Sequence, residues 1–505
     1  MDPHAEVFQQ QWAEAIRLHQ SGHIQAAARI YQALLQQFPG HPHLLHQYGL
    51  AQQALGDLRS AMHLLSQAVV REPDQRAFRL DLGLVLKQMG RSRAALERLQ
   101  EVQQQQPDDA EIHFHVGDTC MDLGEAAAAL EPFRTAIRLR PAFLEAWINL
   151  GLCLKACGQL DEALRCFQQV VQDYPDSIAG HVNLGLTHLL MGHYTLGWQA
   201  YEWRLLATGR EACWVVPDFL LGPQAPPRWT GSALAGKTIL ILAEQGFGDT
   251  LQFVRYVPLL KAAGARVWFI GPPSLLPLLR TVPAMDRIGT AQDFSLAEPA
   301  DCYCPLLSLP LLLHTQVGTI PAEVPYVQAA PDRVPLWADR LGTEKKWRVG
   351  LVWRGKPLHQ NDPLRRRSCT LPDLAPLARL TDVTWVSLQK EAEEDGPLQP
   401  PDGMALLDLR GALSDFAQTA AIVSALDLVI SIDTSVAHLA GALGKPVWIL
   451  LPLAPDWRWS LYQETTPWYP TARLFRQTVP NCWQDPIQRM VTALSQWLPT
   501  HEDPR

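Results

Sequence analysis

Apolar and polar positions repeat every 34 residues through the first 200 residues of the chain, and each period reads as two amphipathic helices. Proline recurs at positions 39, 73, 107, 141 and 175, and glycine recurs at 22, 56, 90, 124, 158 and 192. A second glycine series, at 49, 83, 117, 151 and 185, keeps the same register. Because proline cannot continue a helix, we expect the second helix of each unit to end before it. The first helix is expected to end near a glycine of the first series.

Small and bulky side chains follow the same period. Alanine recurs where helices could approach closely, at Ala27, Ala61, Ala95, Ala129 and Ala163. Bulky side chains recur where one helix could fill the next, at Tyr31, Leu65, Leu99, Phe133 and Phe167. This pattern resembles the tetratricopeptide repeat (TPR). It predicts six units, at 8–41, 42–75, 76–109, 110–143, 144–177 and a divergent 178–211.

Such an array forms a quasi-linear solenoid, and the resemblance implies that its concave face binds a peptide or protein. Two alternatives remain open at this point. The array could support the shape of the rest of the chain, or it could form a homodimer.

The 34-residue period ends after Gly192, and the pattern of apolar and polar residues then changes. Residues 205–235 lose the periodicity and include several prolines. A continuous apolar run at 238–243 is typical of a buried parallel strand. A glycine turn, a predicted helix at 250–263 and a strand at 266–270 follow, which together make a βαβ unit.

A second α/β set begins near Trp347. Strands are predicted at 349–353, 383–388, 428–432 and 447–451, and helices at 371–380, 415–425 and 434–443. The fold class is therefore α plus α/β: an N-terminal α-solenoid followed by two doubly wound domains, whose ligands would lie outside the carboxyl ends of the strands. The predicted domains are a solenoid at 1–206, a linker at 207–235, a first α/β domain at 236–335 and a second, with a C-terminal helix, at 336–505.

Composition narrows the function classes. The 505 residues carry a net charge of -8, which gives no reason to expect a nucleic-acid partner. No apolar run reaches the roughly 20 residues needed to span a bilayer. Nine cysteines are scattered without a CxxC pair, and we expect Cys153 and Cys157, at helical spacing, to be core thiols rather than metal ligands. The odd cysteine count and the lack of an apolar N-terminal segment favour a reducing cytoplasm.

The first candidate motif is the glycine-rich turn at 244–250, which follows a strand and opens a helix. Gly246 and Gly248 would let backbone approach a ligand closely. Asp249 has two interpretations, an N-cap carboxylate and a general base that faces a cleft. The motif lacks the GxGxxG spacing of dinucleotide-binding turns, so no nicotinamide cofactor is expected.

The second motif, at 433–438, also joins a strand end to a helix start. The hydroxyls of Thr434 and Ser435, with the free amides of a helix start, suit a diphosphate. Asp433 could accept hydrogen bonds from sugar hydroxyls. His438 either donates to a phosphate or sugar oxygen or is a packed helical histidine.

A third group consists of cations that could neutralise a leaving diphosphate without a metal ion. Arg354 and Lys356 follow the first strand of the second set, and Arg365–Arg367 come next, although a charge run is usually a solvated loop. Gln389 and Lys390 follow the next strand and are placed similarly. No DxD-type metal motif stands at a strand end.

Four stretches together resemble bacterial tetratricopeptide-repeat proteins whose C-terminal glycosyltransferase is related to the heptosyltransferase family, that is, glycosyltransferase family 9-like. They read YEWR (201–204), AEQGFGDTLQFVRY (243–256), GLVWRGKP with HQND (350–362), and DLVISIDTSVAHLAGALGKPVWILLP (427–452). The resemblance implies a GT-B fold of two Rossmann-like domains and a metal-independent, inverting enzyme without a cofactor. By similarity, Asp249 matches the catalytic aspartate. The donor-binding segment matches Asp433, Thr434, Ser435 and His438.

The chain departs from that family in two respects. The loop after the first strand of the second set, WRGKPLHQND, differs from the family's lysine-containing loop. Heptosyltransferases also lack the repeat array, so its presence here argues against a lipopolysaccharide acceptor. We therefore expect transfer of a sugar from a nucleotide sugar to a hydroxyl of a protein that the TPR array recognises. The alternatives are a glycan or lipid-linked acceptor, and a non-catalytic TPR adaptor.

Overall fold

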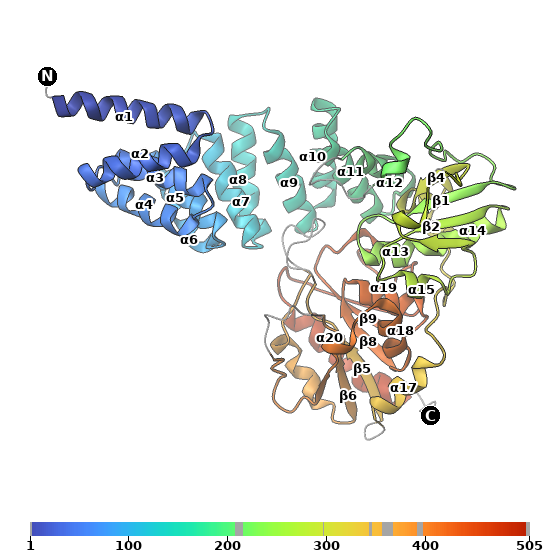
Figure 1. Ribbon diagram of the computed structural model, residues 1–505. Helices are drawn as coiled ribbons and strands as arrows, with labels where there is room; N and C mark the ends of the chain where they lie inside the picture. The colour runs from blue at the N-terminus through green and yellow to red at the C-terminus, as the bar shows by residue number, and fades with distance from the viewer. Residues whose placement is uncertain are drawn as a thin grey trace. The chain divides into compact units, whose positions relative to one another are not determined.

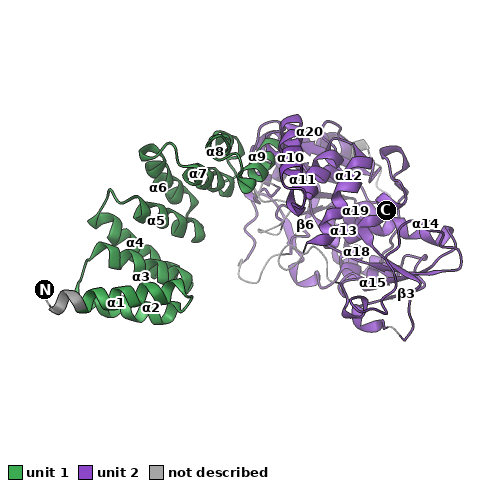
Figure 2. Ribbon diagram, turned by 90° about the horizontal axis from the view of Figure 1, so that it is seen from above, with its two compact units in different colours: residues 1–154 green, residues 155–505 purple. Residues whose placement is uncertain are grey.

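The computed structural model describes residues 3–207, 216–295, 297–342, 346–355, 367–390 and 397–500. The chain divides into two compact units, Met1–Leu154 and Lys155–Arg505, which Figure 2 shows in different colours. Among the described residues, no helix is long and apolar enough to cross a membrane.

Unit 1 is a series of helices, in which each helix from α1 to α7 packs on the next one along the chain (Figure 1). Its helices are α1 (Pro3–Gln20), α2 (Ile24–Gln37), α3 (Pro42–Ala54), α4 (Leu58–Arg71), α5 (Arg76–Gln88), α6 (Ser92–Gln105), α7 (Ala110–Asp122), α8 (Ala126–Leu139) and α9 (Leu144–Ala156), the last of which reaches the unit boundary. Each pair of helices occupies one predicted 34-residue unit, so the helical repeat is confirmed.

The two glycine series have different structural causes. Glycines of the first series end the first helix of each pair with a positive φ, for example 85° at Gly56, which residues with a Cβ rarely adopt. In the second series, Gly49, Gly83 and Gly117 lie against the bulky residue of the next helix. A Cβ added at Gly49 would lie 2.8 Å from Leu65 Cγ, and one at Gly117 would lie 2.8 Å from the Phe133 ring. The period therefore records both helix ends and helix contacts.

Unit 2 opens with the last helices of the array, α10 (Leu160–Asp173), α11 (Ile178–Leu190), α12 (Tyr194–Tyr201) and the short 3-10 helix η1 (Glu202–Leu206). The end of the predicted linker then packs on the first sheet. The backbone N–H of Trp229 donates to the carbonyl of Tyr303 at 2.8 Å. The backbone N–H of Tyr303 in turn donates to the carbonyl of Pro227 at 3.0 Å. The residues just before the first strand are thus part of the α/β fold.

The first sheet is parallel and has the order β3-β2-β1-β4. Its strands are β1 (Thr238–Leu242), β2 (Arg266–Ile270), β3 (Arg287–Gly289) and β4 (Cys302–Pro305). Its helical elements include α13 (Phe247–Phe253), η4 (Val254–Tyr256), α14 (Val257–Ala262), α15 (Leu276–Leu279), η6 (Leu306–Ser308) and α16 (Leu309–Leu312). The predicted helix at 250–263 is thus present but broken at η4.

The second sheet is also parallel, in the order β10-β9-β8-β5-β6-β7. Its strands are β5 (Trp347–Leu351), β6 (Val383–Ser387), β7 (Leu406–Asp408), β8 (Leu428–Ile432), β9 (Val447–Leu451) and β10 (Ala472–Arg476), and its helices include α17 (Arg333–Arg340), α18 (Phe416–Ser424), α19 (Ser435–Ala442) and α20 (Gln484–Thr500). Renumbered from β5, this order is the 3-2-1-4-5-6 of a doubly wound sheet.

One predicted helix has a different form. Residues 371–380 contain the 3-10 helix η8 (Pro372–Arg379) rather than an α-helix. Pro376 has no N–H to donate, so an α-helical hydrogen bond is lost in the middle of the segment.

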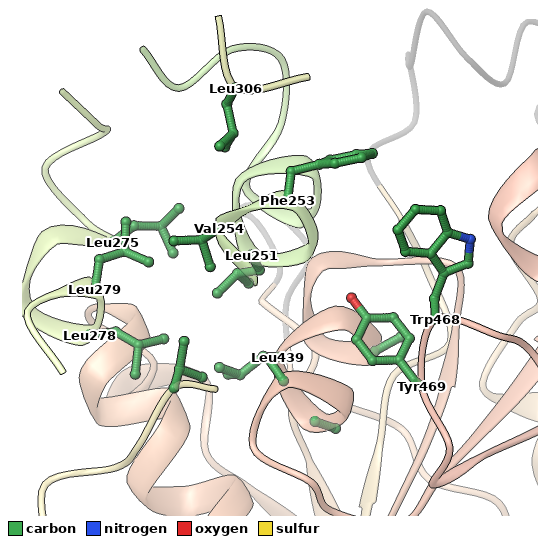
Figure 3. Packing of buried hydrophobic residues seen from close by; sticks show 14 of the residues in the cluster. Leu251, Phe253, Val254, Leu275, Leu278, Leu279, Leu306, Leu439, Trp468 and Tyr469 are labelled. Carbon is green, nitrogen blue, oxygen red and sulfur yellow. The ribbon is translucent and has the colours of Figure 1, made fainter. Parts of the chain in front are cut away.

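One hydrophobic core joins the two sheets. Strands of both sheets contribute to it, for example Ile241 of β1 and Val429 of β8. Figure 3 shows the part where Leu251 of α13 lies near Leu439 of α19, while the ring of Phe253 points to the side of Trp468. The α/β region is therefore packed as one body, which determines how the candidate motifs meet.

Candidate functional site

Both candidate motifs lie at the point where the strand order of a sheet reverses. In the first sheet this point lies between β1 and β4, and the turn after β1 carries Gly246, Gly248 and Asp249. In the second sheet it lies between β5 and β8, and the turn after β8 carries Asp433 and Thr434. Ligands of doubly wound sheets bind outside the carboxyl ends of the strands at these points.

Asp249 has two polar partners. Its Oδ2 accepts a hydrogen bond from the backbone N–H of Gly246 at 2.9 Å, in the manner of a helix cap. Its Oδ1 accepts from Nη2 of Arg458, 209 residues further along the chain. The side chain keeps 14% of its exposure. Asp249 is therefore a capping carboxylate that also reaches the second sheet, and its role as a base stays a prediction.

Arg458 was not among the predicted site residues. It belongs to the loop after β9, within η11 (Trp457–Trp459), and only 5% of it is exposed. Besides Asp249, its guanidinium donates to Asp456 at 2.8 Å and to Gln252. The sequence could have indicated Arg458 as a site residue. The segment at 456–459 follows the predicted strand at 447–451, so it lies at the carboxyl ends of the strands, as the motif at 433–438 does.

His438 lies against the first motif. A Cβ added at Gly248 would lie 2.7 Å from His438 Cδ2, so Gly248 leaves just enough room for the imidazole ring. The ring stacks on Trp459, with centroids 5.1 Å apart, and its Nδ1 lies 2.9 Å from the hydroxyl of Tyr469. Only 4% of the residue is exposed, so the ring is packed, and its contact with a ligand stays a prediction.

The charge states of the second motif follow from burial. Burial, together with Arg458 and Arg255, holds the pKa of His438 well below its usual range, so the ring is neutral at pH 7. Burial and the neighbouring carboxylate of Asp456 raise the pKa of Asp433 to about 6, against the opposing effect of Arg367 and Arg458. Oδ1 of Asp433 and Nε2 of His438 are 3.8 Å apart.

Thr434 and Ser435 open helix α19. Thr434 takes the N-cap position, and its hydroxyl lies 3.0 Å from the hydroxyl of Ser431. Arg367 approaches the same turn, with its Nη1 donating to the Asp433 carbonyl at 3.4 Å. The partly exposed helix start therefore combines hydroxyls, amides and a cation.

The remaining predicted donor residues differ in placement. Gln389 is 5% exposed, and its amide bonds the backbone of the loop after β5: its oxygen accepts from the N–H of Arg354 at 2.9 Å, and its nitrogen donates to the Arg354 carbonyl at 2.9 Å. This amide shapes the loop rather than facing outward. Arg354 is half-buried and Lys390 is exposed. Lys356, Arg365 and Arg366 lie outside the described residues.

Chemically, the assembled residues offer carboxylates from both sheets, and a neutral imidazole and two arginines from the second sheet. The carboxylate of Asp249 pairs with Arg458, and that of Asp433 lies close enough to Arg458 to feel its charge and 3.8 Å from His438. Within the described ranges, no three His, Cys, Asp or Glu side chains gather where they could hold a metal ion. The arrangement is suited to moving a proton beside an anion that two arginines can stabilise.

Comparison with known proteins supports the array. Two sequence models of the tetratricopeptide repeat match, one at residues 80–142 and the other at 18–77 and 121–182. The chain is similar to Protein FlbA of Caulobacter vibrioides, with 29% identity over 342 residues that cover 61% of this chain and 53% of FlbA. It thus spans about half the length of that relative.

Two of the solved structures that are similar to the chain each match about a third of it. A MamA fragment from Desulfovibrio magneticus is 20% identical and matches 35% of this chain and 98% of its own, with a TM-score of 0.33. YrrB, described as a TPR protein with an unusual peptide-binding site, is 17% identical and matches 35% of this chain and 92% of its own, with a TM-score of 0.32. The N-terminal helical array consists of tetratricopeptide repeats, and a parallel-sheet α/β region follows it.

Proposed function

We propose that the α/β region is a GT-B glycosyltransferase that moves a sugar from a nucleotide sugar to a hydroxyl, without a metal ion and with inversion. The acceptor is a protein that the TPR array binds. The observation that carries the proposal is that the two motifs meet. Asp249 pairs with Arg458 of the second sheet, and Gly248 lies against His438, whose Nε2 is 3.8 Å from Asp433. A donor bound at one switch point would thereby present its anomeric carbon to the other.

The reaction assigns one task to each group. The acceptor oxygen bonds to the anomeric carbon while the bond from that carbon to the diphosphate breaks, and the diphosphate leaves with the electron pair. Asp249 takes the proton of the acceptor hydroxyl. A carboxylate has about four lone-pair sites, so the bonds from Gly246 and Arg458 leave room for that proton.

The leaving group is stabilised by the second sheet. The amides at the start of α19 and the hydroxyls of Thr434 and Ser435 would hold the diphosphate. Arg367 and Arg458 would neutralise the charge that develops on it. His438 is neutral, so it would donate a hydrogen bond to the diphosphate without adding a positive charge.

Donor binding tests the proposal directly. Thermal shift and calorimetry with a panel of UDP, GDP, ADP and dTDP sugars should find at least one that binds the full chain. Asp433→Asn should weaken the binding of that nucleotide sugar. Asp408→Asn, which alters an exposed ion pair with Arg410 at the edge of the same sheet, should not. Absence of binding by every nucleotide sugar and nucleoside diphosphate at millimolar concentration would favour the non-catalytic adaptor instead.

A further inference from the structure

The end of the helical array contacts the turn that carries Asp249. The hydroxyl of Tyr201, the last residue of α12, accepts a hydrogen bond from Nε2 of Gln245 at 2.6 Å. Arg204 of η1 donates to both oxygens of Glu244, from Nε and Nη2, at 2.9 Å each. Two adjacent residues of the turn are therefore held by one short segment, 40 residues or more earlier in the chain.

The turn needs such support because its backbone is strained. Gln245 has a φ of 61°, in the left-handed region that residues with a Cβ rarely adopt. Such a conformation is unfavourable in itself and persists only where surrounding contacts determine it. It comes directly before Gly246, whose N–H binds Asp249, so the φ of Gln245 sets the direction in which Asp249 is presented.

The support is buried and its charged groups are paired. Arg204 is 3% exposed and the side chain of Glu244 is fully buried. Glu244 also accepts from the N–H of Leu307 at 2.9 Å, while Arg204 also donates to Glu202 at 2.7 Å and to the hydroxyl of Ser308 at 3.1 Å. A buried pair of this kind contributes little net stability over an apolar substitute but specifies one geometry.

The middle of the same segment faces elsewhere. Trp203 stacks on His181 of α11, with ring centroids 3.6 Å apart and planes 4° from parallel. This contact fastens η1 to the array, whereas Tyr201 and Arg204 fasten it to the turn. The segment thus has one side for each neighbour.

We infer that Tyr201 and Arg204 are positioning residues for Asp249, so that the last element of the array is part of the site. The inference rests on the proposed function and adds to it. It extends the functional α/β region backwards to α12. The two residues act through Gln245 and Glu244 and do not touch the reacting atoms.

The test compares Tyr201→Phe, Arg204→Lys and the control Trp203→Phe in the full chain. Tyr201→Phe removes one hydroxyl, and Arg204→Lys keeps the charge but loses the two-pronged bond. Hydrogen exchange, read by mass spectrometry on peptides that cover residues 244–253, should become roughly 2- to 12-fold faster in the first two variants, as expected for one lost hydrogen bond. Peptides from β8 and β9 should be unchanged.

A kinetic measurement accompanies the exchange. With the donor found by the binding screen, kcat should fall about 10- to 100-fold in both variants while the donor KM stays within a factor of two, because a misplaced group loses rate rather than binding. Trp203→Phe should behave like wild type in both measurements. Equal exchange in all four proteins, or faster exchange throughout unit 2, would overturn the inference. A wild type that transfers no sugar would refute the proposed function alone, since the exchange result stands without it.

Discussion

Replacing Gly248 by alanine tests whether the two motifs meet as described. The added methyl carbon would lie 2.7 Å from His438 Cδ2, whereas carbon atoms pack at about 3.5–4.0 Å. The imidazole has little freedom to retreat, because it stacks on Trp459 and its Nδ1 lies 2.9 Å from the Tyr469 hydroxyl. We expect the ring to be displaced by close to 1 Å relative to α13, or the two helices to separate.

The magnitude follows from two opposing effects. Overpacking of this kind costs typically 1–3 kcal/mol, and alanine in place of glycine within a helix recovers up to about 1 kcal/mol. The sharper quantity is the coupling to the ring. In a His438→Ala background the clash is absent, so Gly248→Ala should become neutral or stabilising there. The coupling energy between the two changes should be about 1–3 kcal/mol.

Scanning calorimetry of the full chain measures this cycle through the transition of unit 2. Each kcal/mol should move that transition by roughly 2 °C. Gly246→Ala is the matched control, since its Cβ would meet only Asp249 Oδ2, at 3.1 Å, and should be insensitive to His438→Ala. A coupling below about 0.5 kcal/mol for Gly248→Ala would refute the contact, because distant sites are additive within that limit.

Further predictions concern charge and repeat packing. Asp433→Asn should raise the free energy of unfolding at pH 7 by up to ~3 kcal/mol, because the folded-state pKa of about 6 exceeds the unfolded value of 3.8, and the gain should vanish in urea titrations below about pH 4. Below pH 6.5 the unfolded chain binds a proton at His438 that the folded, buried ring resists, which lowers the free energy of unfolding by about 1.4 kcal/mol per pH unit. His438→Gln should remove this loss, and an unchanged dependence of stability on pH would contradict the reasoning. In unit 1, Gly117→Ala should lower the melting temperature through a 2.8 Å contact with Phe133, at a cost of about 1–3 kcal/mol, and Phe133→Leu should relieve part of that cost.

Elements with a strong local pattern could be predicted from the sequence. β2, β8 and β9 have the predicted bounds, because each is an apolar run between turn residues. β5 begins two residues earlier than predicted, since it includes the buried Arg348, whose guanidinium bonds the Gly342 carbonyl at 2.6 Å. No local pattern of apolar and polar residues marks a buried arginine whose guanidinium binds a backbone carbonyl.

The candidate site shows the same division. Asp249 and the turn at 433–438 stand out because glycine and hydroxyl residues gather where a strand meets a helix. Arg458 and Tyr469 do not stand out in the sequence, since their partners come from segments far away in the chain. The support given by Arg204 to Glu244 depends likewise on how the last repeat docks on the first sheet. Such pairings are decided by tertiary packing, which periodicity alone does not encode.

The central claim is that Asp249 removes the acceptor proton, and its most direct test compares Asp249→Asn with Asp293→Asn. Both aspartates accept a backbone N–H in the same capping arrangement, Asp293 from Thr290 at 2.7 Å, but only Asp249 also pairs with Arg458 of the second sheet. With the donor from the binding screen, release of nucleoside diphosphate should fall at least 100-fold in Asp249→Asn, as expected for loss of a general base, while donor affinity is retained. Asp293→Asn should release it at the wild-type rate. Equal rates in the two variants would contradict the account.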